Sequence, residues 1–244
     1  MKKQLISFFM ALAAVFFFQQ VALAEGSAWG SLQNSPAEDN NVIGMVYAEK
    51  SVPVWQKDRL KLSPFVSGMF VFDSKGYNWN NKAIARAGGK LDYQVGPSGT
   101  LTLRAGASYE HQFKSGDSYT APFAAAEYWF GWGLGTRSPG SSWGSVGNVS
   151  PSEKGNVIAM AHVEQGFLAF NAADGMVTPF VDFTIMRDTD DYAWNNKEAY
   201  GLGVKYSRSV GKGTVNIGVK AQHEVREVRS YNGAVFFVTF WSPL

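Results

Sequence analysis

The stretch that decides the fold is residues 100–113, which read TLTLRAGASYEHQF. Successive side chains of a β-strand point to opposite faces, so residues two apart share a face. One face carries Leu101, Leu103, Ala105, Ala107, Tyr109 and Phe113, and the other carries Thr102, Arg104, Ser108, Glu110 and Gln112. The period of two therefore predicts a long strand that is apolar on one side and charged on the other.

The same alternation extends over most of the chain. Residues 83–94 and 214–226 repeat it, again with apolar side chains on one face and charged side chains on the other. Gly, Ser, Pro and Asp cluster between such stretches, as at 96–99 and 114–117, and predict turns. No helix is predicted. We expect ten strands, at 42–55, 62–72, 82–95, 100–113, 122–131, 157–170, 178–186, 198–210, 214–227 and 233–241.

The chain also resembles itself. The sequence SAWGS at 27–31 recurs as SSWGS at 141–145, and YNWNNK at 77–82 recurs as YAWNNK at 192–197. An offset of about 115 residues is longer than the period of solenoid and propeller repeats. The pattern therefore indicates an old duplication. It divides the chain into repeat one (27–135), a linker (136–140) and repeat two (141–244).

Two strand counts, ten and twelve, are compatible with the sequence. Five strands in each repeat predict a barrel of about ten, an even number as single-chain outer-membrane barrels require. An odd number per repeat, however, would send equivalent loops to opposite sides of the membrane. A sixth strand in each repeat, near Trp29 and Trp143 or formed by splitting 42–55, would give twelve and remove this inversion.

The first residues have the three parts of a secretory signal peptide. Lys2 and Lys3 precede an apolar run at 5–18, which is followed by Ala22-Leu23-Ala24. The run is shorter than the roughly 20 residues that a spanning helix needs. We therefore expect residues 1–24 to be a cleaved signal peptide and residues 25–244 to form a single barrel domain.

Composition excludes several classes of protein. The chain has no Cys, so it has neither disulfides nor a lipid-modifiable cysteine. Its net charge of +2 comes without any run of like charges, so no nucleic-acid partner is expected. A mean hydropathy of −0.13 is too low for a helical membrane protein, whereas a barrel that alternates apolar and polar faces is compatible with it.

Long alternating strands after a signal peptide predict an all-β protein, a closed antiparallel barrel in a membrane. In hydrocarbon every backbone N–H and C=O must be paired, and a sheet achieves this only when it has no edge. Aromatic clusters at 128–132 and 236–241 lie near strand ends, where girdle residues meet the membrane interface. The alternative is a secreted pair of β-sandwich domains, in which solvent would cover the charged face.

Two features resemble known families. Residues 232–241, which read NGAVFFVTFW, resemble the last strand of bacterial outer-membrane barrels, the strand read by the barrel assembly machinery. The chain then continues with Ser242-Pro243-Leu244, where that pattern usually ends in an aromatic residue. The repeated Pro-Phe and Trp-Asn-Asn-Lys segments resemble the C-terminal barrel of phage-adsorption and exopolysaccharide-export outer-membrane proteins. This resemblance implies an outer-membrane location, with polysaccharide or envelope export proteins as candidate partners.

The charged face of the strands predicts the residues that line the lumen. In a barrel of about eight to ten strands such charges pair with one another and fill the interior, so no wide pore is implied. The candidates are Arg86, Lys90, Asp92, Arg104, Glu110, Lys205, Lys220, Glu224 and Arg226.

Evidence for catalysis is weak in the sequence. Barrel lipases, acyltransferases and proteases need a His paired with a carboxylate. His111 and His223 fall on the apolar face, and His162 shares a face with Glu164 but has no evident Ser partner. The sequence shows no phosphate-binding loop, metal-ligand cluster or nucleophile motif. We therefore predict no enzyme, no metal and no cofactor, and a barrel enzyme built on His162 or another His stays the alternative.

Two further motifs lie in turns. Asp188, Asp190 and Asp191 form an acidic turn without the regular spacing of a Ca²⁺ loop, so a solvated hairpin tip is favoured. Trp79 and Trp194, each beside paired Asn residues, are candidates for stacking on sugar rings, while a turn or girdle role is favoured for both.

Together these features predict an outer-membrane barrel with a narrow, charged lumen, bound by outer-membrane lipids. Its role would be that of a structural component, a surface receptor or a small export or uptake channel. The sequence names no ligand.

Overall fold

The computed structural model describes residues 24–134 and 137–244. The predicted signal peptide lies outside the described residues, apart from Ala24, and so does part of the predicted linker. No helix in the described ranges is long and apolar enough to cross a membrane.

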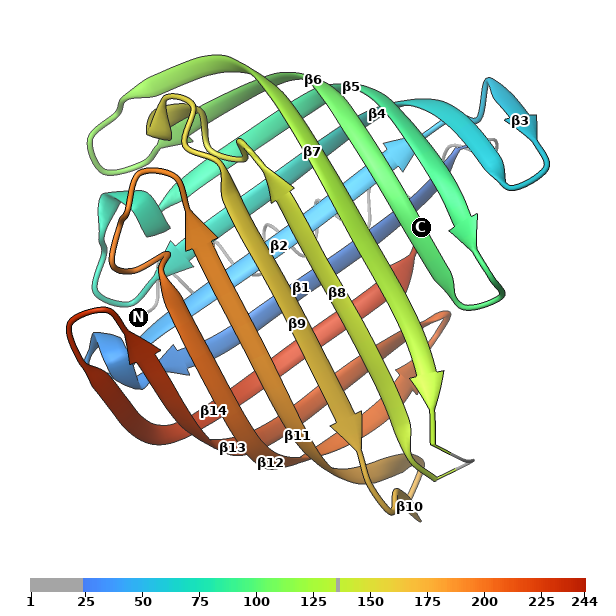
Figure 1. Ribbon diagram of the computed structural model, residues 1–244, viewed down its shortest axis with the longest axis vertical. Coiled ribbons are helices and arrows are strands. Elements are labelled where there is room, and N and C mark those ends of the chain that lie inside the picture. The colour runs from blue at the N-terminus through green and yellow to red at the C-terminus, as the bar shows by residue number, and fades with distance from the viewer. Residues whose placement is uncertain (1–23, 135–136) are drawn as a thin grey trace.

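Within the described ranges, twelve long antiparallel strands form one closed barrel (Figure 1). The wall strands are β1 (Glu25–Ser35), β2 (Asn41–Ser51), β4 (Leu60–Asp73), β5 (Lys82–Val95), β6 (Gly99–Gln112), β7 (Ser118–Gly133), β8 (Pro139–Gly147), β9 (Ile158–Gly166), β11 (Gly175–Asp188), β12 (Lys197–Val210), β13 (Gly213–Arg226) and β14 (Ser230–Pro243). Outside the wall lie the short strands β3 (Trp55–Lys57) and β10 (Phe170–Ala172), and the one-turn helices η2 (Pro36–Glu38), η3 (Asn78–Asn80) and η4 (Pro151–Glu153).

Closure is made by β1, which pairs with β2 on one side and with β14 on the other. In the closing pair Trp29 lies opposite Trp241, and Gln33 lies opposite Phe237. The wall therefore has no unpaired edge, which is the condition for a sheet to exist in hydrocarbon. One closed sheet also excludes the alternative of two separate β-sandwiches.

The predicted number of about ten strands is wrong, because the described chain forms twelve wall strands. The strands missed are β1 and β8, at the Trp29 and Trp143 positions where the alternative of twelve placed them. Both are rich in Gly and Ser, so they show little apolar alternation and resemble loops in sequence. The tandem duplication itself stays a prediction.

The charged faces of the strands point inward. Arg104 of β6 forms an ion pair with Glu49 of β2, although β4 and β5 lie between these strands in the wall. Such a contact is possible only through the barrel interior. Conversely Leu103, the neighbour of Arg104, is 47% exposed, whereas Glu110 on the inner face of the same strand is fully buried. Burial is thus inverted relative to a water-soluble protein.

The two ends of the barrel differ, and we name each by a residue. The Glu25 end is where β1 begins and β14 stops, and it carries the turns after β5 and β12. The Trp79 end carries η2, η3, η4 and the loops at 74–81 and 189–196. In Figure 1 the Trp79 end lies to the left.

Candidate functional site

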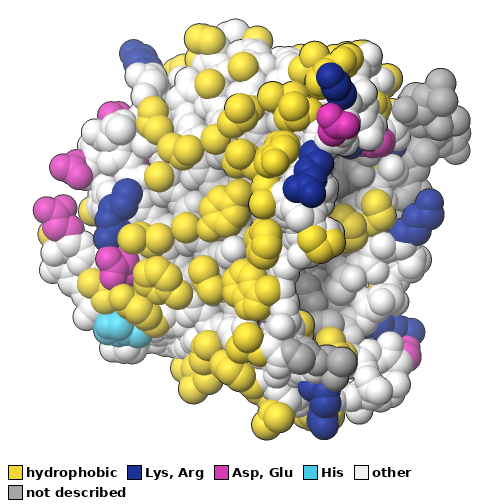
Figure 2. Space-filling model, turned by 45° about the vertical axis from the view of Figure 1, so that its right-hand side comes forward, with side chains coloured by type: hydrophobic (Ala, Val, Ile, Leu, Met, Phe, Trp, Pro, Cys, Tyr) yellow, Lys and Arg dark blue, Asp and Glu magenta, His cyan; other side chains and the backbone are white. Residues whose placement is uncertain are grey.

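The outer surface carries an apolar band. Along β12 the outward side chains run from Glu198 through Tyr200, Leu202, Val204 and Tyr206 to Arg208. Ten residues of strand at about 3.4 Å each, tilted by about 35–45°, give a band about 24–28 Å high. This height matches the roughly 25 Å apolar band of outer-membrane barrels. Figure 2 shows hydrophobic side chains over the middle of the wall and charged side chains toward its ends.

Tyrosines mark both edges of this band. At the Trp79 end the Tyr200 hydroxyl donates a hydrogen bond of 2.8 Å to Glu198, which also pairs with Arg187. At the Glu25 end the Tyr206 hydroxyl donates to Asp174 over 2.6 Å. Each ring therefore lies against the apolar side of a boundary while its hydroxyl reaches charged groups, as expected of interfacial aromatic residues.

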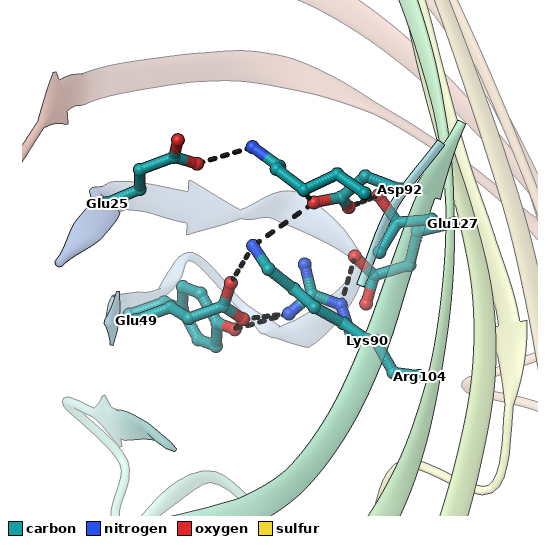
Figure 3. Close-up of polar contacts among 9 residues, drawn as sticks. Glu25, Glu49, Lys90, Asp92, Arg104 and Glu127 are labelled. Carbon is teal, nitrogen blue, oxygen red and sulfur yellow. Dashed lines mark hydrogen bonds and ion pairs between the residues drawn. The ribbon is translucent and has the colours of Figure 1, made fainter. Parts of the chain in front are cut away.

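The lumen holds a cluster of charges in the half formed by β1 to β7 (Figure 3). Glu49 is its centre, because it pairs with Arg104 and, at 2.9 Å, with Lys90. Two further carboxylates share these cations: Asp92 lies 3.5 Å from Lys90 Nζ, and Glu127 lies 3.1 Å from Arg104 Nε. We call these five residues the Glu49 cluster. Pairing across several strands narrows this part of the lumen.

The other half of the lumen has two shorter ion-pair bridges. Lys205 of β12 pairs with Glu164 of β9, across β11. Lys220 of β13 pairs with Asp182 of β11 at 2.5 Å, across β12. Both predicted cations therefore pair with carboxylates two strands away. Such pairs can form only if the side chains point into the barrel.

The remaining predicted lumen residues lie toward the Trp79 end, where they contact two of the one-turn helices, η2 and η4. Glu110 accepts hydrogen bonds from Ser150 at 2.7 Å and from Ser152 at 2.6 Å, both at η4. Arg86 donates to the Val149 carbonyl at 2.6 Å. In the other half Arg226 bridges Glu224, at 2.6 Å, and Glu38 of η2, at 3.8 Å. These contacts bring η2 and η4 against the inner wall at this end.

The sequence prediction included two carboxylate partners of the predicted cations, Asp92 and Glu224, and missed four others on the wall strands: Glu49, Glu127, Glu164 and Asp182. Glu49 and Glu164 occupy inward positions of strands that were predicted, so their alternation could have identified them. The girdle prediction was also incorrect in part. Tyr128 and Phe130 face outward, but Trp129 between them shares its face with Glu127 and points inward. Adjacent strand residues cannot both face the lipid.

Two loops meet over the mouth at the Trp79 end. Tyr77 stacks on Trp79 with ring centroids 4.7 Å apart, and Tyr192 stacks on Trp194 at 4.6 Å. The two Trp rings then stack on each other at 6.1 Å with an interplanar angle of 12°. We call this four-ring stack the aromatic clasp. Its loops come from opposite walls, because four strands separate β5 from β11 one way round the described barrel and four separate β12 from β4 the other way.

Each clasp loop is ordered around an aspartate. Asp188 accepts hydrogen bonds from the side chains of Asn156, Asn195 and Asn196, at 3.0, 2.8 and 2.9 Å. It also accepts one from the backbone N–H of Tyr192 at 3.1 Å. Burial acts to raise the pKa of Asp188, but these hydrogen bonds outweigh it and lower the pKa. The loop beside Trp79 is held in the same way, since Asp73 accepts from Tyr77 and Asn81.

Asp188 is thus committed to hydrogen bonds with its own loop and with Asn156, which precedes β9. Among the described residues, no group of three or more His, Cys, Asp or Glu side chains is arranged to hold a metal ion. Trp79 and Trp194, the candidate sugar contacts, each stack on a Tyr and on the other Trp, and the two residues are 50% and 45% exposed. Their role as sugar contacts stays a prediction.

The three histidines lie in different environments. His162 faces the lumen, where it stacks on Trp143 at 5.2 Å and lies 2.8 Å from the Thr184 hydroxyl. His111 lies 3.0 Å from the Ser118 hydroxyl on the outer face, while Glu110 points into the barrel. His223 lies 2.8 Å from Asn232. The enzyme alternative therefore stays a hypothesis.

Neither a protein-family model nor a curated protein sequence matches this chain. Among solved structures, the β domain of the Bordetella autotransporter BrkA is 14% identical, with a TM-score of 0.41, over 90% of this chain and 98% of its own. An outer membrane channel from Pseudomonas putida F1 is 10% identical, with a TM-score of 0.48, over 92% and 97%. LpxR from Salmonella typhimurium is 10% identical, with a TM-score of 0.43, over 88% and 99%.

Likenesses of this degree do not assign a function, so the barrel rests on the strand pairing of the chain itself. The predicted resemblance to phage-adsorption and exopolysaccharide-export proteins finds no support in these comparisons.

Proposed function

We propose that the protein spans the bacterial outer membrane as a closed barrel and acts there as a narrow, gated passage for small solutes. The observation that carries the proposal is the inverted burial: apolar side chains cover a band of membrane height outside, and paired charges fill the interior. In water this arrangement would expose a large apolar surface. In a bilayer the apolar band contacts lipid, and the charged side chains lie inside, away from the lipid.

The passage is narrow at two levels. The Glu49 cluster and the two bridges in the other half cover the inner wall with paired charged side chains that project into the lumen. At the Trp79 end the aromatic clasp joins opposite walls above the mouth. Aromatic stacking contributes only about 0.5–1.5 kcal/mol per pair beyond its buried area. The Trp79–Trp194 contact is therefore weak enough to open and close, and we assign it the role of the gate.

Two measurements test the proposal in sequence. Heat-modifiable gel migration and fractionation with the outer membrane test the barrel and its location, and recovery as a soluble periplasmic protein would contradict both. Conductance of the full chain in planar bilayers then tests the gate.

The informative variant for the gate is the double substitution Trp79→Ala and Trp194→Ala. It should leave heat-modifiability unchanged and raise the open probability several-fold, because no ring then joins the two loops. Trp55→Ala is the matched control, since Trp55 lies on β3 outside the wall. A clasp variant that inserts normally and conducts like the wild type would rule out the gate.

A further inference from the structure

We propose that the lumen at the Glu25 end binds an oligosaccharide between two pairs of tryptophans on opposite walls. The pairs are Trp29 with Trp241 and Trp129 with Trp143, and each pair lies side by side on adjacent strands. The inference rests on the proposed passage and names its solute class. It uses tryptophans other than those of the aromatic clasp.

All four rings point into the barrel. Trp29 stacks on Tyr47 at 5.5 Å, and the Tyr47 hydroxyl accepts a hydrogen bond from Arg104, which crosses the interior from β6. Trp143 stacks on His162, whose strand neighbour on the same face, Glu164, reaches Lys205 across β11. Trp241 and Trp129 lie opposite Trp29 and Trp143 in the strand register, so they share the inner face.

The two pairs face each other. Strands β2, β4, β5 and β6 lie between β1 and β7 on one side of the described wall, and β9, β11, β12 and β13 lie between β8 and β14 on the other. The β14–β1 seam and the β7–β8 seam are therefore half a circumference apart. All four rings lie within a few residues of the Glu25 end of their strands. A solute that enters from this end passes between them.

The rings remain accessible although they point inward. Trp129 is 52% exposed and Trp241 is 51% exposed, in contrast to the buried charges deeper in the lumen. The six-membered part of the Trp129 indole lies close to Gly131, so this ring lies along the wall. The absence of a side chain on Gly131 makes room for it. Such a ring can offer its other face to a ligand in the lumen.

Hydroxyl groups flank the rings on the same face. Ser27 and Ser31 lie two residues to either side of Trp29, and Ser141 and Ser145 lie in the same places beside Trp143. Thr239 lies opposite Ser31. A stripe of hydroxyl, indole and hydroxyl suits a pyranose, whose apolar ring faces stack on aromatic groups while its hydroxyls form hydrogen bonds. An apolar ligand would leave the flanking hydroxyls without a partner.

The test uses the full-length protein in detergent, with maltohexaose and cellohexaose as probes. Sorbitol is the control ligand, because it has comparable hydroxyls but no rigid ring face. Trp oxidation by N-bromosuccinimide, read by mass spectrometry, maps the site. We expect either hexasaccharide to protect Trp129 and Trp241 in a saturable way, with Trp55 unprotected and sorbitol without effect. The double substitution Trp129→Ala and Trp241→Ala should weaken binding about tenfold or more, and Phe at both positions should restore part of it.

The outcomes separate this inference from the proposed passage. Protein that is heat-modifiable, conducts ions and binds neither hexasaccharide would overturn the sugar site while the passage stands. Binding that persists unchanged in the double Ala variant would overturn the assignment to these tryptophans. Saturable binding by a barrel that never conducts would leave the sugar site in place as a receptor site and contradict the passage.

Discussion

Glu49→Gln removes the carboxylate that serves two cations in the lumen. Glu49 is 4% exposed, and it pairs with Arg104 and with Lys90, the latter at 2.9 Å. The amide that replaces it keeps the shape and one acceptor but not the charge. Lys90 and Arg104 would then depend on Asp92 and Glu127, at 3.5 and 3.1 Å.

The size of the effect follows from these remaining partners. Removing one member of a buried ion pair costs about 3–5 kcal/mol, because the other charge is left uncompensated. Since each cation of the Glu49 cluster keeps a second carboxylate, we expect a loss of about 2–3 kcal/mol in the free energy of unfolding. Glu198→Gln is the matched control, an outward carboxylate whose partner Arg187 has a side chain 48% exposed. Its loss should be much smaller, because solvent screens an exposed ion pair.

Urea unfolding in phospholipid vesicles, followed by Trp fluorescence, measures both values. The midpoint should shift for Glu49→Gln at an unchanged dependence on urea, which indicates a loss of stability and not of compactness. A loss for Glu49→Gln no larger than that for Glu198→Gln would refute the reasoning, because the Glu49 cluster would then be solvated like the surface.

Two other predictions follow from the outer band and from the clasp loops. Leu202 is 66% exposed and lies midway between Glu198 and Arg208, so it should face the centre of the bilayer. Leu202→Arg should lower the free energy of unfolding by about 2–4 kcal/mol in the same assay. A loss near zero would place Leu202 outside the lipid. Asp188 lies beyond the Arg187–Glu198 ion pair, which marks the edge of the outer apolar band at the Trp79 end. Because folding lowers the pKa of Asp188, its contribution to stability is present above the unfolded-state pKa of about 4 and is lost as the pH falls through the lower folded-state pKa. Trp194 fluorescence, in a variant with the other tryptophans replaced by Phe, reports whether the loop is ordered. The loop should therefore stay ordered at pH 5 and become disordered in stronger acid, and in Asp188→Asn it should be disordered already at pH 7. Fluorescence that changes neither with acid nor with the substitution would contradict the role of Asp188 in ordering the loop.

Much of the barrel could be predicted from local pattern. The alternation at 100–113 and 214–226 matches β6 and β13 to within a residue at each end, and 82–95 matches β5. The pattern failed where side chains are small: β1 and β8 carry Gly and Ser, and their place in the wall depends on pairing with distant strands. Gly30 illustrates why, because a Cβ there would meet the Phe240 ring of β14.

The candidate site was predicted less completely. The nine charged residues expected in the lumen all lie on the inner face, but their partners follow from geometry, as with Arg104 and Glu49, 55 positions apart. Trp79 and Trp194, each beside paired Asn residues in a turn, could be predicted as candidate sugar contacts. That they stack on each other could not be inferred, since β4–β5 and β11–β12 meet only after the barrel closes.

The sequence by itself determined that this chain forms long strands with an apolar face and a charged face, because a period of two is a local property of the backbone. Only the tertiary structure decided how many strands close the wall and which side chains meet across it. Those outcomes depend on the β1–β14 pairing between the first and last described strands, which turns a sheet into a barrel and brings opposite walls within reach of one another.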